Sequence, residues 1–220
     1  MSLVKQSGGD APKRSPFDSL KKAASAPLLP SNRRLDLLLD VSSSMGVRCS
    51  SGRAAIEELE DAARATIAEY SSRVEMSAVL FGTVNERRVL RVPVKALPKL
   101  EACGGTPMHL AIYEFALASA GSHAILMSDG RPDDPRSVRA AVESVAASKV
   151  IHTIACGPGA DEELLKWIAN RTGGKFFRLG DAIDLPNAFL ELARVAVAAL
   201  TTGQEAIPAG GNDVRETPNQ

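Results

Sequence analysis

The feature that most constrains the fold of this chain is the regular alternation of strand-like and helix-like segments. Residues 35–41, with the sequence LDLLLDV, are nearly all apolar, and the run is short enough for a strand buried on both faces. From about Gly52 to Tyr70, apolar residues recur at spacings of three and four, which predicts an amphipathic helix. Alternation of this kind is typical of helices packed on both faces of a mostly parallel sheet.

The rest of the chain continues the pattern, with one exception to the parallel arrangement. A turn near Asn85 leads into a segment in which Arg91 and Pro93 alternate with apolar residues, which suits an antiparallel hairpin at an exposed edge. The predicted fold class is α/β with three layers: a central, mostly parallel six-stranded sheet with one antiparallel edge strand, and helices on both faces. We expect the further strands at residues 74–81, 87–94, 123–128, 149–156 and 175–179, and the further helices at 107–120, 135–147, 161–170 and 185–200.

Size and charge limit the kinds of function to consider. The chain has 220 residues, of which 26 are basic and 26 acidic, so its formal net charge is zero. A neutral chain has no overall field that would attract nucleic acid or anionic lipid, and we expect neither a nucleic-acid nor a membrane partner. A domain of this length buries about 70% of its unfolded surface, so folding requires no disulfide or structural metal. Any metal ligands therefore need a functional explanation.

Cysteine usage and hydropathy favour a cytoplasmic location. The three cysteines, Cys49, Cys103 and Cys156, are widely spaced and odd in number, unlike the framework of a small secreted domain. The first thirty residues hold no continuous apolar segment of a signal peptide, and no apolar run is long enough to cross a bilayer. We interpret the cysteines as isolated thiols. Cys49 and Cys103 flank two of the loops that hold the candidate metal ligands described below, so a redox-sensitive pair is the alternative.

Three regions follow from composition along the chain. Residues 1–34 form a basic arm with seven Lys or Arg and two Asp, and residues 201–220 return to Gly, Pro and polar residues without periodicity. Between them, residues 35–200 form the folded domain. The arm is expected to be a flexible solvated leader, with contact to an acidic partner or RNA as the alternative.

Small oxygen-bearing side chains gather where strands are predicted to end. Asp40, Ser42 and Ser44 follow the first strand, Thr106 lies in a Cys-Gly-Gly-Thr-Pro loop, and Asp129 follows the strand at 123–128. If those two strands are neighbours, the two carboxylates start about 5 Å apart and repel unless a proton or cation neutralises them. An all-oxygen set suits hard cations, Mg²⁺ first and Mn²⁺ or Ca²⁺ next, and a partner's carboxylate would complete the octahedron.

This arrangement resembles the von Willebrand factor type A domain and its metal-ion-dependent adhesion site, whose pattern is D-x-S-x-S, then T, then D. All five positions are filled, and the contexts GGTP and LMSDG strengthen the match over residues 35–200. The resemblance implies a Rossmann-like sheet that begins with the edge hairpin and has the Asp40 and Asp129 strands adjacent at its centre. It also implies that Ser42, Ser44 and Thr106 touch the metal through hydroxyls, with Asp40 and Asp129 acting directly or through water.

The resemblance extends to function. It implies a metal-dependent module that captures a Glu or Asp of a partner protein, which would be a kinase, a phosphatase or an AAA+ ATPase. The stretch SDGRPDD looks like that of bacterial intracellular members, such as the TerY-like proteins of tellurite-resistance and stress operons. The implied role is an adaptor in an intracellular stress or signalling system.

Each residue also has a simpler interpretation. Thr106 before Pro107 is a good helix start, as is Asp134 before Pro135, and for Asp134 we accept the cap. Ser42, Ser44 and the Asp129–Gly130 pair each suit a turn, so only the joint pattern argues for a metal. The loop arginines Arg48 and Arg131 would either orient an incoming acid or remain solvated, and we interpret His109, His123, His152 and Trp167 as structural.

The competing function is catalysis. A Mg²⁺-dependent phosphotransferase or phosphatase of the haloacid dehalogenase type also places an Asp at the end of a central strand. Those enzymes have a D-x-D pattern, whereas Ser42 stands at the second position here and removes the general acid and base. The phosphate-loop, nucleophile-elbow and dinucleotide-binding motifs are also missing from the sequence. We therefore expect a binding module and not an enzyme.

Overall fold

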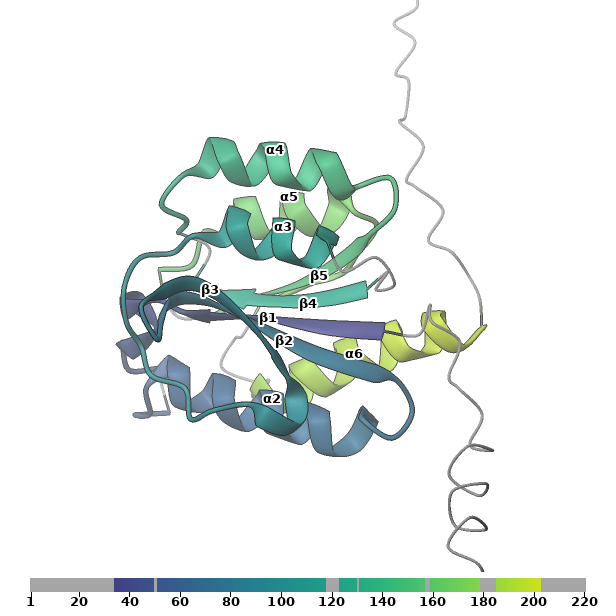
Figure 1. Ribbon diagram of the computed structural model, residues 1–220, viewed down its shortest axis with the longest axis horizontal. Coiled ribbons are helices and arrows are strands. Elements are labelled where there is room, and N and C mark those ends of the chain that lie inside the picture. Colours follow the sequence, from purple (N-terminus) through teal and green to yellow (C-terminus); the bar gives the residue numbers. More distant parts are fainter. Residues whose placement is uncertain are drawn as a thin grey trace, which may run out of the picture.

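The computed structural model describes residues 34–49, 51–117, 123–129, 131–156, 159–178 and 185–202. Over these residues, six strands form one sheet that lies between two layers of helices, as the alternation predicted (Figure 1). The strands are β1 (Arg34–Val41), β2 (Glu75–Val84), β3 (Arg87–Pro93), β4 (His123–Ser128), β5 (Val150–Ala155) and β6 (Phe176–Arg178). The helices are α2 (Ala55–Tyr70), α3 (Met108–Leu117), α4 (Pro135–Val145), α5 (Glu162–Arg171) and α6 (Leu185–Thr202), with short 3-10 turns η1 (Ser43–Gly46) and η2 (Val94–Ala96).

The sheet order places β1 at the centre. The order is β3-β2-β1-β4-β5-β6, and every neighbouring pair is parallel except the β2–β3 hairpin. In β1, Leu39 is paired with Met127 of β4, so both strands end at the same edge of the sheet. The antiparallel edge strand and the adjacency of the Asp40 and Asp129 strands are thereby confirmed.

The side chains of β1 alternate between the two helical layers. Leu37 and its odd-numbered neighbours pack in the core with α2 and α6, whereas Leu38 packs with α3, α4 and α5 (Figure 1). Because successive strand residues point to opposite faces, Asp36 and Asp40 share the face of Leu38. Both aspartates are fully buried. The run LDLLLDV is therefore apolar on both sides except for two carboxylates on one of them.

Asp36 is neutralised by a buried ionic network at the end of β1 away from Asp40. Arg34 Nε and Arg91 Nη1 each lie 2.9 Å from one of its carboxylate oxygens, and the Ser77 hydroxyl donates a 2.6 Å hydrogen bond. Arg91 lies on the edge strand β3, where the sequence pattern predicted an exposed edge. Its guanidinium crosses β2 to reach Asp36, whose buried charge it compensates, and also pairs with Glu114 of α3 at 3.0 Å.

Two histidines form a second buried polar pair. His123 and His152 stack with ring centroids 5.7 Å apart, and His123 Nδ1 lies 3.4 Å from His152 Nε2. Since the Lys175 backbone N–H donates to His152 Nδ1, neutral His152 carries its proton on Nε2 and donates it to His123. Burial lowers the pKa of His123 to about 4 and that of His152 to about 3. These histidines are structural, as the sequence indicated.

Several boundaries differ from those expected. The chain makes the η1 turn and a loop before α2 begins at Ala55, three residues after Gly52, and β1 starts one residue early, at Arg34. The last helix continues to Thr202, two residues beyond the predicted end of that helix. The predicted arm and tail lie outside the described residues, apart from Arg34 and residues 201–202. Among the helices that the structure describes, none is long and apolar enough to cross a membrane.

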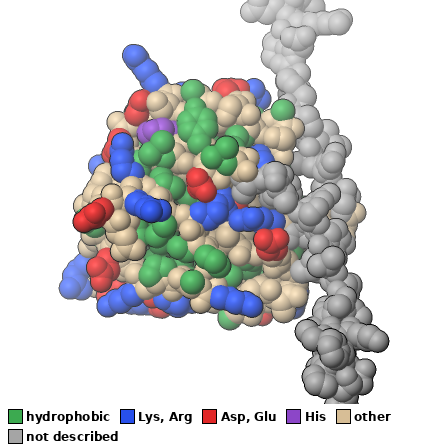
Figure 2. Space-filling view, viewed as in Figure 1, with side chains coloured by type: hydrophobic (Ala, Val, Ile, Leu, Met, Phe, Trp, Pro, Cys, Tyr) green, Lys and Arg blue, Asp and Glu red, His purple; other side chains and the backbone are tan. Residues whose placement is uncertain are grey.

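The surface has the mixed charge that the balanced composition suggests. On the face shown in Figure 2, acidic and basic side chains are interspersed with hydrophobic ones. All three cysteines are free: Cys49 is half-buried, Cys103 exposed and Cys156 buried. Trp167 packs against the core cluster on the α3–α5 side, with the Arg139 guanidinium 4.6 Å from its ring centroid, which agrees with the structural role expected for it.

Candidate metal centre

Asp40 is the buried carboxylate at the carboxyl end of β1. Its Oδ1 accepts a 2.8 Å hydrogen bond from the backbone N–H of Ser42, and its Oδ2 accepts one from the Ser128 hydroxyl on β4. Burial raises the pKa of Asp40 to about 6, and the nearby carboxylate of Asp129 adds to the increase. Hydrogen bonds from neutral donors fix the orientation of this carboxylate but leave its charge uncompensated, which favours uptake of a cation.

The two serines of the D-x-S-x-S stretch lie at the η1 turn that follows β1: Ser42 is its N-cap, and Ser44 lies within it. Their hydroxyl oxygens are 3.0 Å apart, with Ser42 buried and Ser44 exposed. Met45 is buried within the core on the α2–α6 side and anchors the turn. The turn therefore brings two neutral oxygen donors together immediately beyond Asp40, with one of them open to solvent.

Backbone hydrogen bonds bring the Thr106 loop to the same place. The N–H of Cys103 donates to the carbonyl of Val41 at 2.7 Å, and the N–H of Ser43 donates to the carbonyl of Gly104 at 3.0 Å. Gly104 has a φ of +83°, and a Cβ there would lie 1.9 Å from Thr83 Oγ1, so only glycine fits this approach. The loop is thus fixed against both the end of β1 and the η1 turn, with Thr106 almost fully buried.

Asp133 holds the Thr106 loop from the other side, and sequence reasoning missed it. Its Oδ1 accepts a 2.7 Å hydrogen bond from the Thr106 N–H, and its own N–H donates to the Thr106 carbonyl at 3.0 Å. Arg88 of β3 pairs with its second oxygen. A Cβ on Gly105 would lie 2.7 Å from the Asp133 carboxylate, which explains the second glycine of the loop. The next residue, Asp134, caps α4 as expected, accepting from the N–H groups of Arg136 and Ser137.

Asp129 follows β4 directly and is half-buried. Its Oδ1 accepts a 3.1 Å hydrogen bond from the Arg131 N–H, and its carbonyl accepts one from Asp161 at 2.8 Å. Asp129 and Ser44 line one cavity of about 220 Å³. The strand pairing, the loop hydrogen bonds and this shared cavity place Asp129 at the same end of the sheet as the other four predicted ligands, although its partner in the turn, Gly130, lies outside the described residues.

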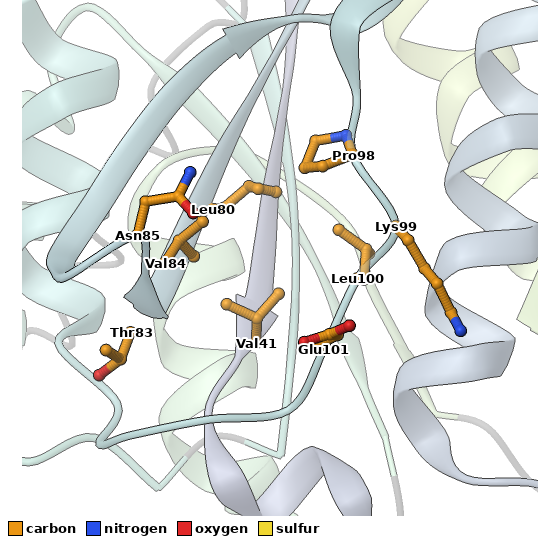
Figure 3. Close-up of a pocket in the computed structure, with 9 residues that line it drawn as sticks. All are labelled: Val41, Leu80, Thr83, Val84, Asn85, Pro98, Lys99, Leu100 and Glu101. Carbon is orange, nitrogen blue, oxygen red and sulfur yellow. The ribbon is translucent and has the colours of Figure 1, made fainter.

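A second, smaller hollow on this side of the sheet is separate from these residues. It measures about 130 Å³ and lies between the β2–β3 hairpin and residues 98–101 (Figure 3). Val41, Leu80 and Leu100 contribute apolar walls, and Lys99 extends away from it (Figure 3). All five predicted ligands are among the described residues, and none of them lines this hollow, so it is not part of the candidate centre.

The side chains at the candidate centre fit a hard divalent cation. They supply two carboxylates and three hydroxyls, and the described residues contain no cluster of three or more His, Cys, Asp or Glu. Soft or nitrogen-preferring metals therefore lack their usual ligands at this site. A +2 ion would balance Asp40 and Asp129 while the hydroxyls add no further charge.

Comparison with known proteins was made by sequence and by structure. No protein-family model matches the chain. Calcium-activated chloride channel regulator 1 of Bos taurus is 31% identical over 124 residues, which are 55% of this chain and 13% of that protein. Among solved structures, von Willebrand factor type A from Catenulispora acidiphila superimposes with a TM-score of 0.62 and 20% identity, covering 76% of this chain and 43% of that one. The chain has the von Willebrand factor type A fold.

Two other proteins with similar structures were solved with metal. The manganese-loaded TRAP protein of Plasmodium vivax has a TM-score of 0.51 and 17% identity, and the match covers 73% of this chain and 74% of that chain. Proximal thread matrix protein 1 from the mussel byssus, with zinc in its MIDAS motif, has a TM-score of 0.50 and 13% identity. The match covers 77% of this chain and 45% of that chain. At these identities the likeness concerns the fold. The chain spans less than half of the Catenulispora protein and about an eighth of the bovine one.

Proposed function

We propose that this chain is a divalent-metal-dependent protein-binding module that captures an acidic residue of a partner. The observation that carries the proposal is the convergence of five oxygen-bearing side chains at one edge of the sheet. Asp40, Ser42 and Ser44 lie at the end of β1, Asp129 follows the adjacent strand, and hydrogen bonds hold the Thr106 loop against β1 and η1.

Each of these residues has a distinct role in the proposed centre. Asp40 and Asp129 supply the negative charge that attracts the ion, and Ser42, Ser44 and Thr106 supply neutral oxygens. With only two formal negative charges in the protein's set, a +2 ion remains electrophilic and attracts the carboxylate of a partner. We propose Mg²⁺ as the ion, with Mn²⁺ or Ca²⁺ as alternatives. The structural neighbours solved with manganese and zinc support a divalent ion without selecting one.

Binding accounts for these residues better than catalysis does. A phosphotransferase of the kind considered above needs a second acid two residues after the nucleophilic Asp. That position holds Ser42, whose hydroxyl is hydrogen-bonded to Ser44, and a serine hydroxyl cannot supply a proton as a carboxylic acid does. We therefore propose that the chain is not an enzyme.

The cellular setting is proposed from sequence resemblance. We propose a cytoplasmic adaptor in a bacterial stress or signalling system of the tellurite-resistance type, with a kinase, a phosphatase or an AAA+ ATPase as partner. The intracellular setting accords with three cysteines that remain free.

The test uses displayed peptides, because the partner is unknown. A library of heptapeptides with a fixed central Glu is selected on the immobilised full chain in Mg²⁺ and eluted with EDTA, beside a matched library with a central Gln. We expect EDTA-released binders from the Glu library only. The parent protein and Asp129→Ala are compared, and the variant should recover none. Equal recovery from the two libraries, or binding that survives EDTA, would show that no metal-bound acid is captured.

A further inference from the structure

A cavity beside the proposed metal centre is lined mostly by residues that are not among the proposed metal ligands. This cavity, called here the side pocket, measures about 220 Å³, and Ser44 and Asp129 form one of its walls. The remaining lining residues are Met45, Val47, Arg48, Cys49, Ala55, Arg131, Cys156 and Gly159. A partner whose acid reaches the metal would pass directly beside this opening.

The floor of the side pocket is apolar. Met45, Ala55 and Cys156 are almost fully buried, and Cys49 is half-buried against the same core cluster. Burial raises the pKa of both thiols, so at neutral pH they are protonated and behave as small hydrophobic groups. The same burial argues against the Cys49–Cys103 redox pair considered from sequence, because Cys49 is not a ready thiolate.

The rim of the side pocket exposes a large hydrophobic residue. Val47 is 56% exposed, although valine is among the residues most often found inside proteins. Val47 lines the side pocket together with the buried apolar residues, so the apolar lining reaches the surface. A hydrophobic floor that continues onto an exposed rim indicates a site for an apolar ligand group.

Two arginines give the rim its charge. Arg48 donates to the carbonyl of Gly52 at 2.6 Å, and the backbone N–H of Arg131 donates to Asp129. In the described part of the chain, neither guanidinium forms an ion pair with a carboxylate, whereas ten other Arg or Lys residues there form thirteen such pairs. Both side chains are exposed, so they are available to a second acidic residue of the ligand.

We propose that the partner segment is acidic and carries, beside its metal-binding Glu or Asp, one Leu-, Met- or Phe-sized side chain that enters the side pocket. A further acid of the segment pairs with Arg131 or Arg48. This inference rests on the proposed function, because the metal-bound acid sets the position of the segment. The volume suits one side chain: an apolar cavity of about 150 Å³ already accepts benzene, and drug-sized ligands need about 300 Å³ or more.

The test reads the positions that flank Glu in the same displayed library. We expect enrichment of Leu, Met or Phe at one fixed position and of Asp or Glu at another. A binder from this selection is then synthesised with Ser in place of its apolar residue, and both peptides are titrated against the parent and against Ala55→Leu, which fills the floor of the side pocket. The apolar peptide should lose about tenfold in affinity for Ala55→Leu, and the Ser peptide should bind both proteins equally.

Two controls separate the side pocket from the metal centre and from folding. The first control measures Mg²⁺ binding by calorimetry and thermal unfolding of Ala55→Leu, to show that this variant keeps the metal centre and the fold. The second control is Val47→Ser, a variant on the exposed rim, where substitution does not disturb the core. Metal-dependent Glu peptides without apolar enrichment, or unchanged affinities in both variants, would overturn the side-pocket inference and leave the proposed function standing. Failure to recover any EDTA-released Glu peptide would overturn both.

Discussion

Asp36 and Asp40 lie four residues apart on the same face of β1, and both are fully buried, yet among the residues that the structure describes only Asp36 has oppositely charged partners. Arg34 and Arg91 both reach Asp36, whereas the hydrogen bonds to Asp40 come from the neutral groups of Ser42 and Ser128. Asp36 therefore stabilises the fold, whereas Asp40 carries a buried negative charge that a bound cation would compensate.

The two aspartates should respond oppositely to neutralisation in metal-free protein. The pKa of Asp40 is raised from 3.8 to about 6, so its contribution to stability is full below pH 3.8 and is lost as the pH rises through 6. At pH 7.5 the ionised Asp40 is destabilising by roughly 2–3 kcal/mol, and Asp40→Asn should raise the free energy of unfolding by about that amount. Asp36→Asn should lower it by about 2 kcal/mol or more, because two arginines lose their partner.

Urea unfolding in EDTA at pH 7.5 measures both effects, with the parent as reference. A loss of stability in Asp40→Asn comparable with that in Asp36→Asn would mean that Asp40 is an ordinary structural carboxylate.

Asp133 and Asp134 are adjacent and should differ in function. Asp133→Ala removes the partner of the Thr106 N–H, so we expect Mg²⁺ affinity to fall about three- to tenfold, together with about 1 kcal/mol of stability. Asp134→Ala removes the α4 cap and should cost roughly 0.5–2 kcal/mol of stability while leaving Mg²⁺ affinity unchanged. Calorimetry measures the Mg²⁺ affinity of both variants, and urea unfolding measures their stability. If both variants bind Mg²⁺ as tightly as the parent, Asp133 does not position the Thr106 loop for metal binding.

The histidine pair should make the protein sensitive to mild acid. The pKa values of His123 and His152, about 4 and 3, lie below the unfolded value of 6.5, so protons bind preferentially to the unfolded chain. The stability that the histidine pair contributes is therefore full above pH 6.5 and falls as the pH decreases toward 4. Between pH 6.5 and 5, each histidine should account for a loss of about 2 kcal/mol.

Urea unfolding at several pH values in EDTA gives this slope. In His152→Gln, which keeps an acceptor for the Lys175 N–H, the stability lost between pH 6.5 and 5 should be smaller than in the parent by the share of one histidine, about 2 kcal/mol. An identical slope in the variant would show that other groups cause the acid sensitivity.

Catalysis can be tested directly with a generic phosphomonoester. Because Ser42 replaces the second acid, we expect p-nitrophenyl phosphate with Mg²⁺ to be turned over no faster by the parent than by Asp40→Asn. Mg²⁺-dependent release of nitrophenol that Asp40→Asn abolishes would instead favour the phosphotransferase interpretation.

Local pattern predicted most of the fold. The strand at His123–Ser128 has the predicted bounds. The run LDLLLDV forms the buried central strand, because an apolar run of that length fits a strand and is too short for a typical helix. The η1 turn and the start of α2 were missed, since the loop after Ser44 has no apolar period and its path is set by irregular backbone hydrogen bonds, such as the one from the Ala55 N–H to the Val47 carbonyl.

The five candidate ligands could be named from sequence, but the residues that support them could not. Ser128 reaches Asp40 from 88 residues away, and nothing in its local sequence distinguishes it from a turn serine. Asp133 and Asp134 are chemically identical neighbours. The Asp134-Pro135 pair predicted a helix cap at Asp134, but no signal in the sequence indicated the role of Asp133. Arg91 has an edge-strand pattern, but a long flexible side chain can cross a neighbouring strand to a buried acid. Such contacts are set by tertiary packing.

The central claim is most directly tested by calorimetric titration of the metal-stripped full chain with Mg²⁺. We predict one saturable site in the parent and in Asp134→Ala, at least tenfold weaker binding in Asp40→Ala and in Asp129→Ala, and a smaller loss in Thr106→Ala. Binding that is the same in the parent, Asp40→Ala and Asp129→Ala would contradict the account.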